Sequence, residues 1–91
     1  MELQWTGKAL SDLSRIYEFL KPVNQEAAAR AVQTLATAPR TLLDYPRIGE
    51  RLDDFTNREI RRLLVGKYEI RYEVSNGTIL ILRLWHTRER R

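Results

Sequence analysis

The sequence predicts an α+β fold, with two helices in the N-terminal half and a meander of three strands in the C-terminal third. Two changes of hydrophobic period carry this prediction. Apolar residues recur every three or four positions across residues 7–35, as in amphipathic helices, and every second position across residues 67–74, as in a half-buried strand. Asn76-Gly77 supplies the tight turn of a β-hairpin, because both residues tolerate a positive φ. The expected order of elements is strand, helix, helix, strand, strand, strand.

The chain is expected to begin with a short strand followed by a helix. Leu3 and Trp5 alternate with polar neighbours, which indicates the strand. Thr6 can cap a helix that runs from Gly7 to about Lys21, where Pro22 follows. The apolar stripe of this helix is Ala9, Leu10, Leu13, Ile16, Tyr17 and Leu20.

A second helix is expected after Asn24, which is a good N-cap and is followed by Glu26 near the positive end of the helix dipole. Its buried stripe is Ala28, Ala31, Val32 and Leu35. Pro39 either stops this helix or kinks it into a final turn that holds Leu42 and Leu43. The stretch from about Asp44 to Asn57 has no clean period and is expected to be a loop.

Three strands are expected in the last third, over Arg58 to Val65, Lys67 to Val74 and Thr78 to His86. The middle strand would place Tyr68, Ile70, Tyr72 and Val74 on a packed face, and Lys67, Glu69, Arg71 and Glu73 on a charged one. On that face, cross-strand charge pairs in contact with solvent are at least as well supported as ligand contacts. The run from Thr78 to Leu82 is apolar on both faces, which indicates a central strand.

Composition excludes several classes of function. Residues 1–91 are expected to form one domain, which at this length buries about 60 to 65% of the surface of the unfolded chain. The sequence holds no cysteine and one histidine, so we expect no disulfide, no thiol nucleophile, no metal site and no cofactor. No stretch resembles a secretory signal or is long enough to span a bilayer, which predicts a cytoplasmic protein without a membrane partner.

The positive charge is concentrated in the meander. From Arg58 to Arg91 there are nine Lys and Arg residues against four Asp and Glu residues, whereas Met1 to Asn57 holds seven against eight. An electropositive part in an otherwise balanced chain indicates an anionic partner.

The ordered elements and a set of short motifs resemble the RelE/ParE superfamily, the toxins of type II toxin–antitoxin modules. The resemblance covers essentially the whole chain and is carried by Trp5-Thr6 with Ala9-Leu10 and Asp12-Leu13, by Pro46-Arg47-Ile48-Gly49, by Ile60-Arg61, by Gly66 to Tyr72, and by Ile79 to Arg88. It implies an antiparallel sheet with two N-terminal helices packed on one face, and a small cytoplasmic toxin that a cognate antitoxin neutralises.

Two unrelated activities occur in this superfamily. RelE-like members cut messenger RNA in the ribosome without a metal, and attack by a ribose 2′-hydroxyl needs a base, an acid and cations for the phosphorane charge. If the chain is RelE-like, its catalytic candidates are His86, Arg88 and Arg61, with Arg71 and Arg83 as further charge stabilisers. Arg88, in the run Arg88-Glu89-Arg90, matches a phosphate-stabilising arginine of those nucleases in place and context.

ParE-like members instead poison DNA gyrase and need no catalytic set. This chain has Tyr68-Glu69 where the nucleases have Tyr-Arg, and their catalytic tyrosine would fall beyond Arg91. Their basic pair before the third strand is clear only as Arg61 and Arg62. These departures favour a ParE-like inhibitor of gyrase, with the ribosome and its messenger RNA as the alternative target. A non-enzymatic nucleic-acid-binding module is a third possibility, weakened because the tyrosines and the cations fall on opposite strand faces.

The predicted partner-binding surface, for gyrase or an acidic antitoxin, is Arg61, Lys67, Arg71, Arg83, Trp85, His86, Arg88 and Arg90. For His86, a structural role at the end of a strand is supported as well as a functional one. Trp85 is expected to pack at the core or an edge, with a partner surface as the alternative. An amphipathic antitoxin segment should bury apolar surface beside the helices and the sheet.

Overall fold

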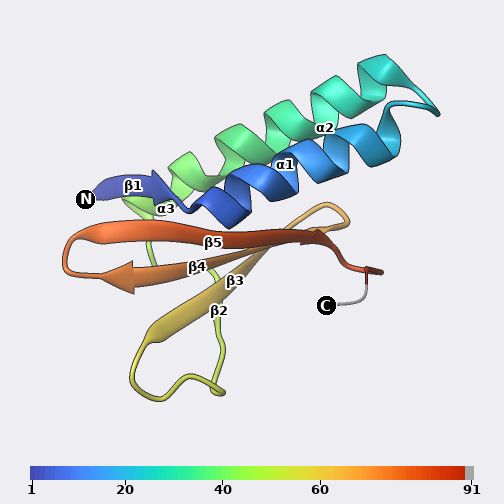
Figure 1. Cartoon of the computed structure of the whole chain (residues 1–91). Helices are drawn as coiled ribbons and strands as arrows, with labels where there is room; N and C mark the ends of the chain where they lie inside the picture. The colour runs from blue at the N-terminus through green and yellow to red at the C-terminus, as the bar shows by residue number, and fades with distance from the viewer. Residues whose placement is uncertain (90–91) are drawn as a thin grey trace.

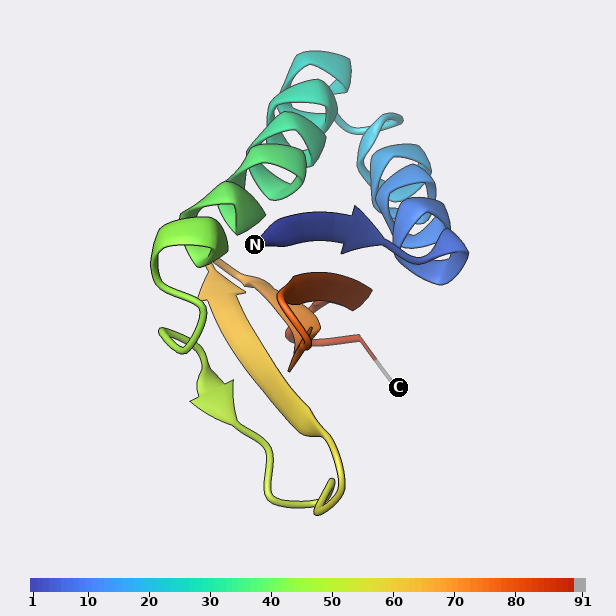
Figure 2. The same cartoon turned by 90° about the vertical axis from the view of Figure 1, so that its left-hand side faces the viewer.

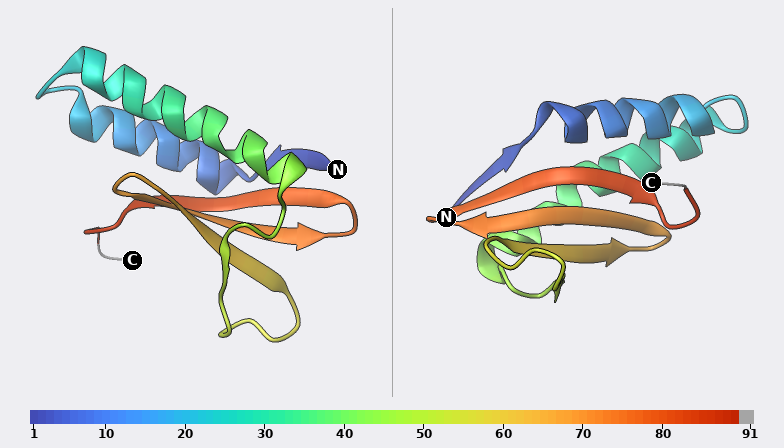
Figure 3. Two further views of the ribbon diagram at one scale, coloured as in Figure 1. Left: turned by 180° about the vertical axis from the view of Figure 1, so that it is seen from behind. Right: turned by 60° about the horizontal axis from the view of Figure 1, so that its bottom comes forward.

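The computed structural model describes residues 1–89, in which two helices lie across one face of a five-stranded sheet (Figure 1). The elements are β1 (Glu2–Trp5), α1 (Gly7–Leu20), α2 (Gln25–Thr37), the 3₁₀ turn η1 (Ala38–Arg40), α3 (Thr41–Asp44), β2 (Glu50–Arg51), β3 (Glu59–Val65), β4 (Tyr68–Ser75) and β5 (Thr78–His86). This confirms the predicted α+β class with both long helices on one face. The turn between α1 and α2 lies beyond the end of β5 (Figure 3, left).

The helix boundaries follow the capping residues. The Thr6 hydroxyl accepts a hydrogen bond from Ala9 N–H (3.0 Å), and the Asn24 side chain accepts one from Ala27 N–H (3.0 Å), which confirms both predicted N-caps. Pro39 does not end the helical path. It lies in η1, and the chain continues into the short α3, which buries Leu42.

The sheet has the order β1-β5-β4-β3-β2, so β5 is a central strand as predicted. Strands β3, β4 and β5 form the antiparallel meander, and β1 pairs parallel with β5. Asn76 and Gly77 have φ angles of 48° and 76°, as the β4–β5 turn requires. In Figure 2 the sheet twists so strongly that β2 and β3 turn away from β1.

Two features of the sheet were not predicted. The expected loop contains β2, a two-residue strand that pairs with β3 and is too short to give a sequence period. Strand β5 carries a bulge, because Arg71 pairs with Arg83 while Tyr72 pairs with Ile81 and leaves Leu82 as an extra residue. The bulge shifts the side-chain alternation, so that Leu84 faces the helices together with Ile79 and Ile81.

Tyr72 anchors the loop after α3 to the core. Its buried ring lies beneath the helices, and its hydroxyl donates to the Pro46 carbonyl (2.8 Å) while it accepts from Gly49 N–H (3.0 Å). Two backbone groups of an otherwise irregular loop are satisfied in this way. The predicted loop motif therefore has a structural role in positioning β2.

Gly49 lies close against the sheet. A Cβ there would lie 2.6 Å from the Arg62 carbonyl oxygen and 2.7 Å from the Tyr72 hydroxyl. We expect Gly49→Ala to lower the free energy of unfolding by about 1–3 kcal/mol, because the backbone must shift. Urea denaturation measures this, with Gly7→Ala as the control, since a Cβ at Gly7 meets nothing within 4 Å. Equal stability of the two variants would contradict the close contact.

Candidate partner-binding site

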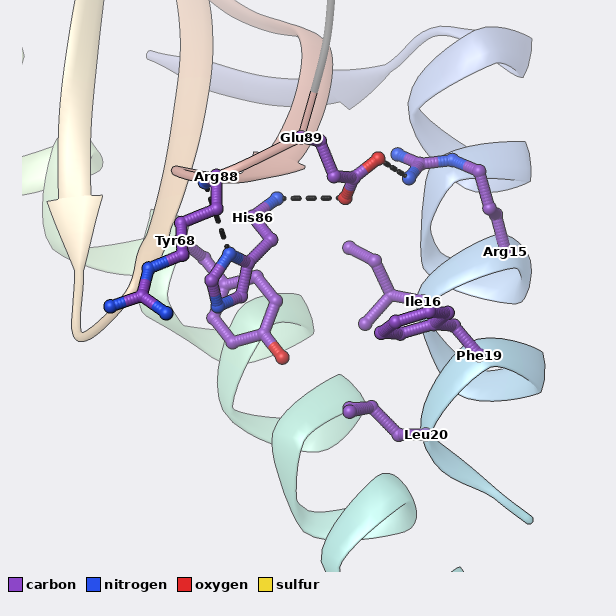
Figure 4. Close-up of a pocket in the computed structure, with 8 residues that line it drawn as sticks. All are labelled: Arg15, Ile16, Phe19, Leu20, Tyr68, His86, Arg88 and Glu89. Atoms are coloured by element: carbon purple, nitrogen blue, oxygen red, sulfur yellow. Dashed lines mark hydrogen bonds and ion pairs between the residues drawn. The ribbon is translucent and has the colours of Figure 1, made fainter. Parts of the chain in front are cut away.

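A groove runs between the helical hairpin and the end of the sheet where β4 begins and β5 ends. Its first part is a hollow of about 400 Å³ lined by Arg15, Ile16, Phe19, Leu20, Tyr68, His86, Arg88 and Glu89 (Figure 4). A second hollow of about 420 Å³ lies under α2 and is lined by Arg30, Ala31, Thr34, Leu35, Val65, Gly66, Lys67, Tyr68 and His86. The two hollows share Tyr68 and His86, whose rings meet edge to face with centroids 5.3 Å apart.

The α1 wall of this groove is apolar. Ile16, Phe19 and Leu20 point from the helix toward Tyr68 across the first hollow (Figure 4). Phe19 is 79% exposed, although its side chain is large and apolar. An exposed aromatic residue beside a hollow of this size is typical of a surface that a partner covers.

A hydrogen-bonded turn at the C-terminal end of β5 forms the opposite wall. Thr87 N–H donates to the Lys67 carbonyl (2.8 Å), and Glu89 N–H donates to the His86 carbonyl (3.0 Å). The Nδ1 atom of His86 accepts from Arg88 N–H (3.1 Å), which places the ring proton of the neutral imidazole on Nε2. His86 thus orders this turn while its ring packs on Tyr68.

Glu89 joins the turn to α1. One carboxylate oxygen accepts from His86 N–H (2.9 Å), and the other forms an ion pair with Arg15. Burial, and then the negative charge of Glu89, raise the pKa of the Tyr68 hydroxyl, so this hydroxyl stays protonated at neutral pH.

The Asp12 side chain binds the backbone of β5 in the part of that strand with which β1 does not pair. Strand β1 ends at Trp5, opposite Ile81. Past that point the buried Asp12 carboxylate accepts hydrogen bonds from Leu84 N–H (2.8 Å), Arg83 Nε (2.8 Å) and Arg15 Nη2 (3.1 Å). The same Arg15 nitrogen donates to the Leu84 carbonyl (2.8 Å). Side chains of α1 therefore take the place of a neighbouring strand.

The pKa of Asp12 reflects this environment. Burial acts to raise it, but the hydrogen bonds from Arg83, Leu84 and Arg15 outweigh burial and hold the pKa below its usual value. Asp12 is therefore a carboxylate at neutral pH, and it fixes the positions of Arg15, which lines the groove, and of Arg83.

The face of the sheet opposite the helices differs from the solvated charged face that we predicted. Glu69 is fully buried and forms ion pairs with Arg71 (3.1 Å) and Arg62 (3.7 Å). Trp85 is 7% exposed, with the Arg71 and Arg83 guanidinium groups 4.8 Å and 5.1 Å from its ring centroid. Trp85 and the arginines stacked on it exclude solvent from Glu69, so this face is a packed polar layer.

The cations of the sheet and of the groove divide into paired and unpaired groups. Arg83 is bound to Asp12, and Arg62 and Arg71 are bound to carboxylates on the sheet. Among residues 1–89, Arg30, Lys67 and Arg88 have no carboxylate within 4.0 Å. Lys67 and Arg88 belong to the predicted surface, and Arg90 lies outside the described residues.

The groove also contains residues that the sequence analysis missed, namely Arg15, Phe19, Arg30 and Glu89. Phe19 gave a signal, because it is aromatic yet lies outside the apolar stripe of its helix. Arg15 and Arg30 gave no such signal, since in the sequence each is indistinguishable from an ordinary solvated helix residue.

Residues 1–89 hold neither a metal site nor a membrane-spanning helix. Within residues 1–89, no three His, Asp or Glu side chains lie together as a metal site would need. No helix in this range has the length and apolar character to cross a membrane.

Comparison with known proteins places the chain in a family. The model of the family described as "ParE toxin of type II toxin-antitoxin system, parDE" matches residues 3–91. The chain belongs to the ParE toxin family. It is therefore a type II toxin of the RelE/ParE superfamily, a membership that implies a cognate antitoxin as its partner.

Relatives of the toxin include proteins named for either branch of the superfamily. It is 38% identical over 85 residues to "Toxin RelE2" of Caulobacter vibrioides, with 93% of each chain covered. It is also similar to a solved chain of the chromosomal ParDE system from P. aeruginosa, with a TM-score of 0.81 and 27% identity. That match covers 94% of the toxin and 95% of the solved chain.

The three candidate nuclease residues of the toxin do not lie together. His86 and Arg88 share the C-terminal turn. On β4, Arg61 pairs with Tyr72 and His86 pairs with Tyr68. Tyr68 and Tyr72 are four residues apart in the strand, which separates the two pairs by about 13 Å. Arg61 is mostly buried, and it binds Glu59 (2.8 Å) and the Gly49 carbonyl (2.7 Å). These contacts give it a structural role in the β2–β3 region.

Proposed function

We propose that this toxin arrests growth by inhibiting DNA gyrase, and that a cognate antitoxin neutralises it by binding along the groove. The observation that carries the choice of gyrase is the neutralised sheet face. Arg62 and Arg71 are engaged by the buried Glu69, and Arg83 by Asp12. The bound carboxylates offset the positive charge of these guanidinium groups, so the arginines attract a phosphate less strongly than unpaired cations would. Moving one fully onto a phosphate would leave a buried carboxylate without its cation, which is costly.

The acid–base requirements of RNA cleavage support the same choice. In-line cleavage needs a base, an acid and free cations around one phosphate. Of the predicted set, His86 and Arg88 share one turn while Arg61 is bound elsewhere. The Nδ1 atom of His86 already accepts a hydrogen bond.

Ribosome-dependent cleavage of messenger RNA is the second candidate. It is favoured by the relative named "Toxin RelE2" and by the adjacency of His86 to Arg88, which has no carboxylate within 4.0 Å among residues 1–89. A nucleic-acid-binding module has less support, because Trp85 and Tyr72 are buried and offer no stacking surface.

Induced expression separates the two toxin activities. Inhibition of gyrase should give filamentous cells and a DNA damage response, whereas cleavage of messenger RNA should stop protein synthesis first. We expect His86→Ala and Arg88→Ala to weaken growth arrest at equal protein level, because both residues belong to the surface that we predict to bind gyrase. Arg40→Ala is the control, since it removes an exposed cation outside either hollow. Rapid loss of translation without a DNA damage response would contradict the proposal.

A further inference from the structure

We propose that Arg15 recognises an acidic side chain of the antitoxin, and that Glu89 is an internal competitor that occupies Arg15 in the free toxin. The inference rests on the proposed neutralisation by an antitoxin in the groove. It names Arg15 as the residue that binds a carboxylate of the antitoxin. It also requires the Arg15–Glu89 ion pair to open when the antitoxin binds.

Arg15 is already positioned to bind a carboxylate. Its Nη2 atom is held by Asp12 (3.1 Å) and by the Leu84 carbonyl (2.8 Å), and both contacts are independent of Glu89. Its Nη1 atom is directed to Glu89 at the edge of the first hollow (Figure 4). When Glu89 leaves, the guanidinium therefore keeps its orientation, and little conformational entropy is lost when a second carboxylate replaces the first.

The Arg15–Glu89 pair is accessible enough to exchange. The two side chains are 39% and 32% exposed, whereas the Asp12 side chain that holds Arg15 from the other side is 5% exposed. An ion pair at this exposure contributes little net stability, so its opening costs little. A buried pair such as the one Asp12 makes could not be exchanged in this way.

The surroundings of Arg15 identify the chemistry of the partner. Ile16, Phe19 and Leu20 follow Arg15 along α1 and offer an apolar wall. Arg88, Lys67 and Arg30 border the two hollows without a carboxylate partner among residues 1–89. The complementary ligand is an amphipathic peptide segment with apolar side chains toward α1 and acidic side chains toward these cations. The phosphate backbone of a nucleic acid carries a charge at every nucleotide and no apolar side chains, so it would leave the apolar wall uncovered.

Removing the competitor should strengthen binding, which is the opposite of what loss of a contact residue normally does. Glu89→Gln keeps an oxygen that accepts from His86 N–H, so the turn is retained, and it removes the charge that competes for Arg15. The probe is the candidate antitoxin, the purified protein encoded by the reading frame next to that of the toxin. We expect it to bind this variant about two- to fivefold more tightly than the wild type. Arg15→Gln should weaken the same complex by about tenfold or more.

The controls separate a local effect from a general one. Glu18→Gln removes the same charge from an exposed position on α1 that does not line the groove, so its effect on affinity should be much smaller. In the Arg15→Gln background, Glu89→Gln should no longer strengthen binding, because the group for which Glu89 competes is absent. The effect of Glu89→Gln in this background is measured against Arg15→Gln alone, so the comparison is valid even if Arg15→Gln lowers stability.

Isothermal titration calorimetry at fixed salt concentration gives the affinities. Weaker binding by Glu89→Gln, equal gains from Glu89→Gln and Glu18→Gln, or an undiminished gain in the Arg15→Gln background would each overturn the competition. Failure of the wild-type toxin to bind the adjacent protein at all would instead contradict the proposed neutralisation, and with it the partner assigned to the groove.

Discussion

Asp12→Asn is expected to lower the free energy of unfolding by about 2–3 kcal/mol, a large share of the stability of a domain of this size. The buried carboxylate is the common acceptor for Arg83, Arg15 and Leu84 N–H. An amide has one acceptor oxygen, so at least one of these donors loses its bond. The value lies below that of a fully buried ion pair, because the side chains of Arg83 and Arg15 are 37% and 39% exposed.

Chemical denaturation with a matched variant checks this expectation. Glu73→Gln neutralises a carboxylate whose partner, Arg58, lies at the surface, so its cost should stay below about 1 kcal/mol. Equal losses in the two variants would contradict the role assigned to Asp12 at the edge of β5.

The pH dependence of the same variant has a defined sign. Hydrogen bonds lower the pKa of Asp12 in the folded state, so its stabilisation is complete above the unfolded pKa of about 4. It is lost as the pH falls through the lower folded pKa. The stability difference between wild type and Asp12→Asn should therefore be constant near neutral pH and shrink below about pH 4.

Phe19→Asp is expected to weaken antitoxin binding by about a hundredfold while leaving the fold unchanged. The substitution removes an apolar side chain whose burial in a complex contributes about 1.5–3 kcal/mol. It also places a negative charge where we expect an acidic partner. Stability should hold, because the Phe19 ring is already exposed in the free toxin.

Val23→Asp is the matched control for this variant. Val23 is the most exposed large apolar residue among residues 1–89 and lies in the turn between α1 and α2, outside the residues that line the groove. Binding titrations should show little change for Val23→Asp. A similar loss of affinity in both variants would mean that the antitoxin covers the hairpin turn and not the groove alone.

The sequence was most informative where local chemistry decides the structure. Thr6 and Asn24 begin their helices because each side chain satisfies a free backbone N–H, and this depends only on neighbouring residues. The β4–β5 turn likewise follows from Asn76 and Gly77. Hydrophobic alternation was sufficient for β4, since one face of that strand had to be buried, and the run from Thr78 to Leu82, apolar on both faces, indicated that β5 is a central strand.

The features that the sequence could not reveal depend on residues that are distant in the chain. The bulge at Leu82 depends on the register between β4 and β5, which alternation alone does not specify. Glu69 reads as a solvated residue, and its burial requires Trp85 and Arg71 on the same face. The groove brings residues 15–20 of α1 against Tyr68 and the turn after β5, and charge pairing leaves only some of the predicted cations available.

Supercoiling by purified DNA gyrase, with ribosome-bound messenger RNA tested in parallel, examines the central claim most directly. We predict that the toxin inhibits supercoiling at micromolar concentration, that the purified antitoxin relieves this inhibition, and that the messenger RNA stays intact. Cleavage of the ribosome-bound messenger by toxin that leaves supercoiling untouched would contradict the account and assign the groove to a nuclease.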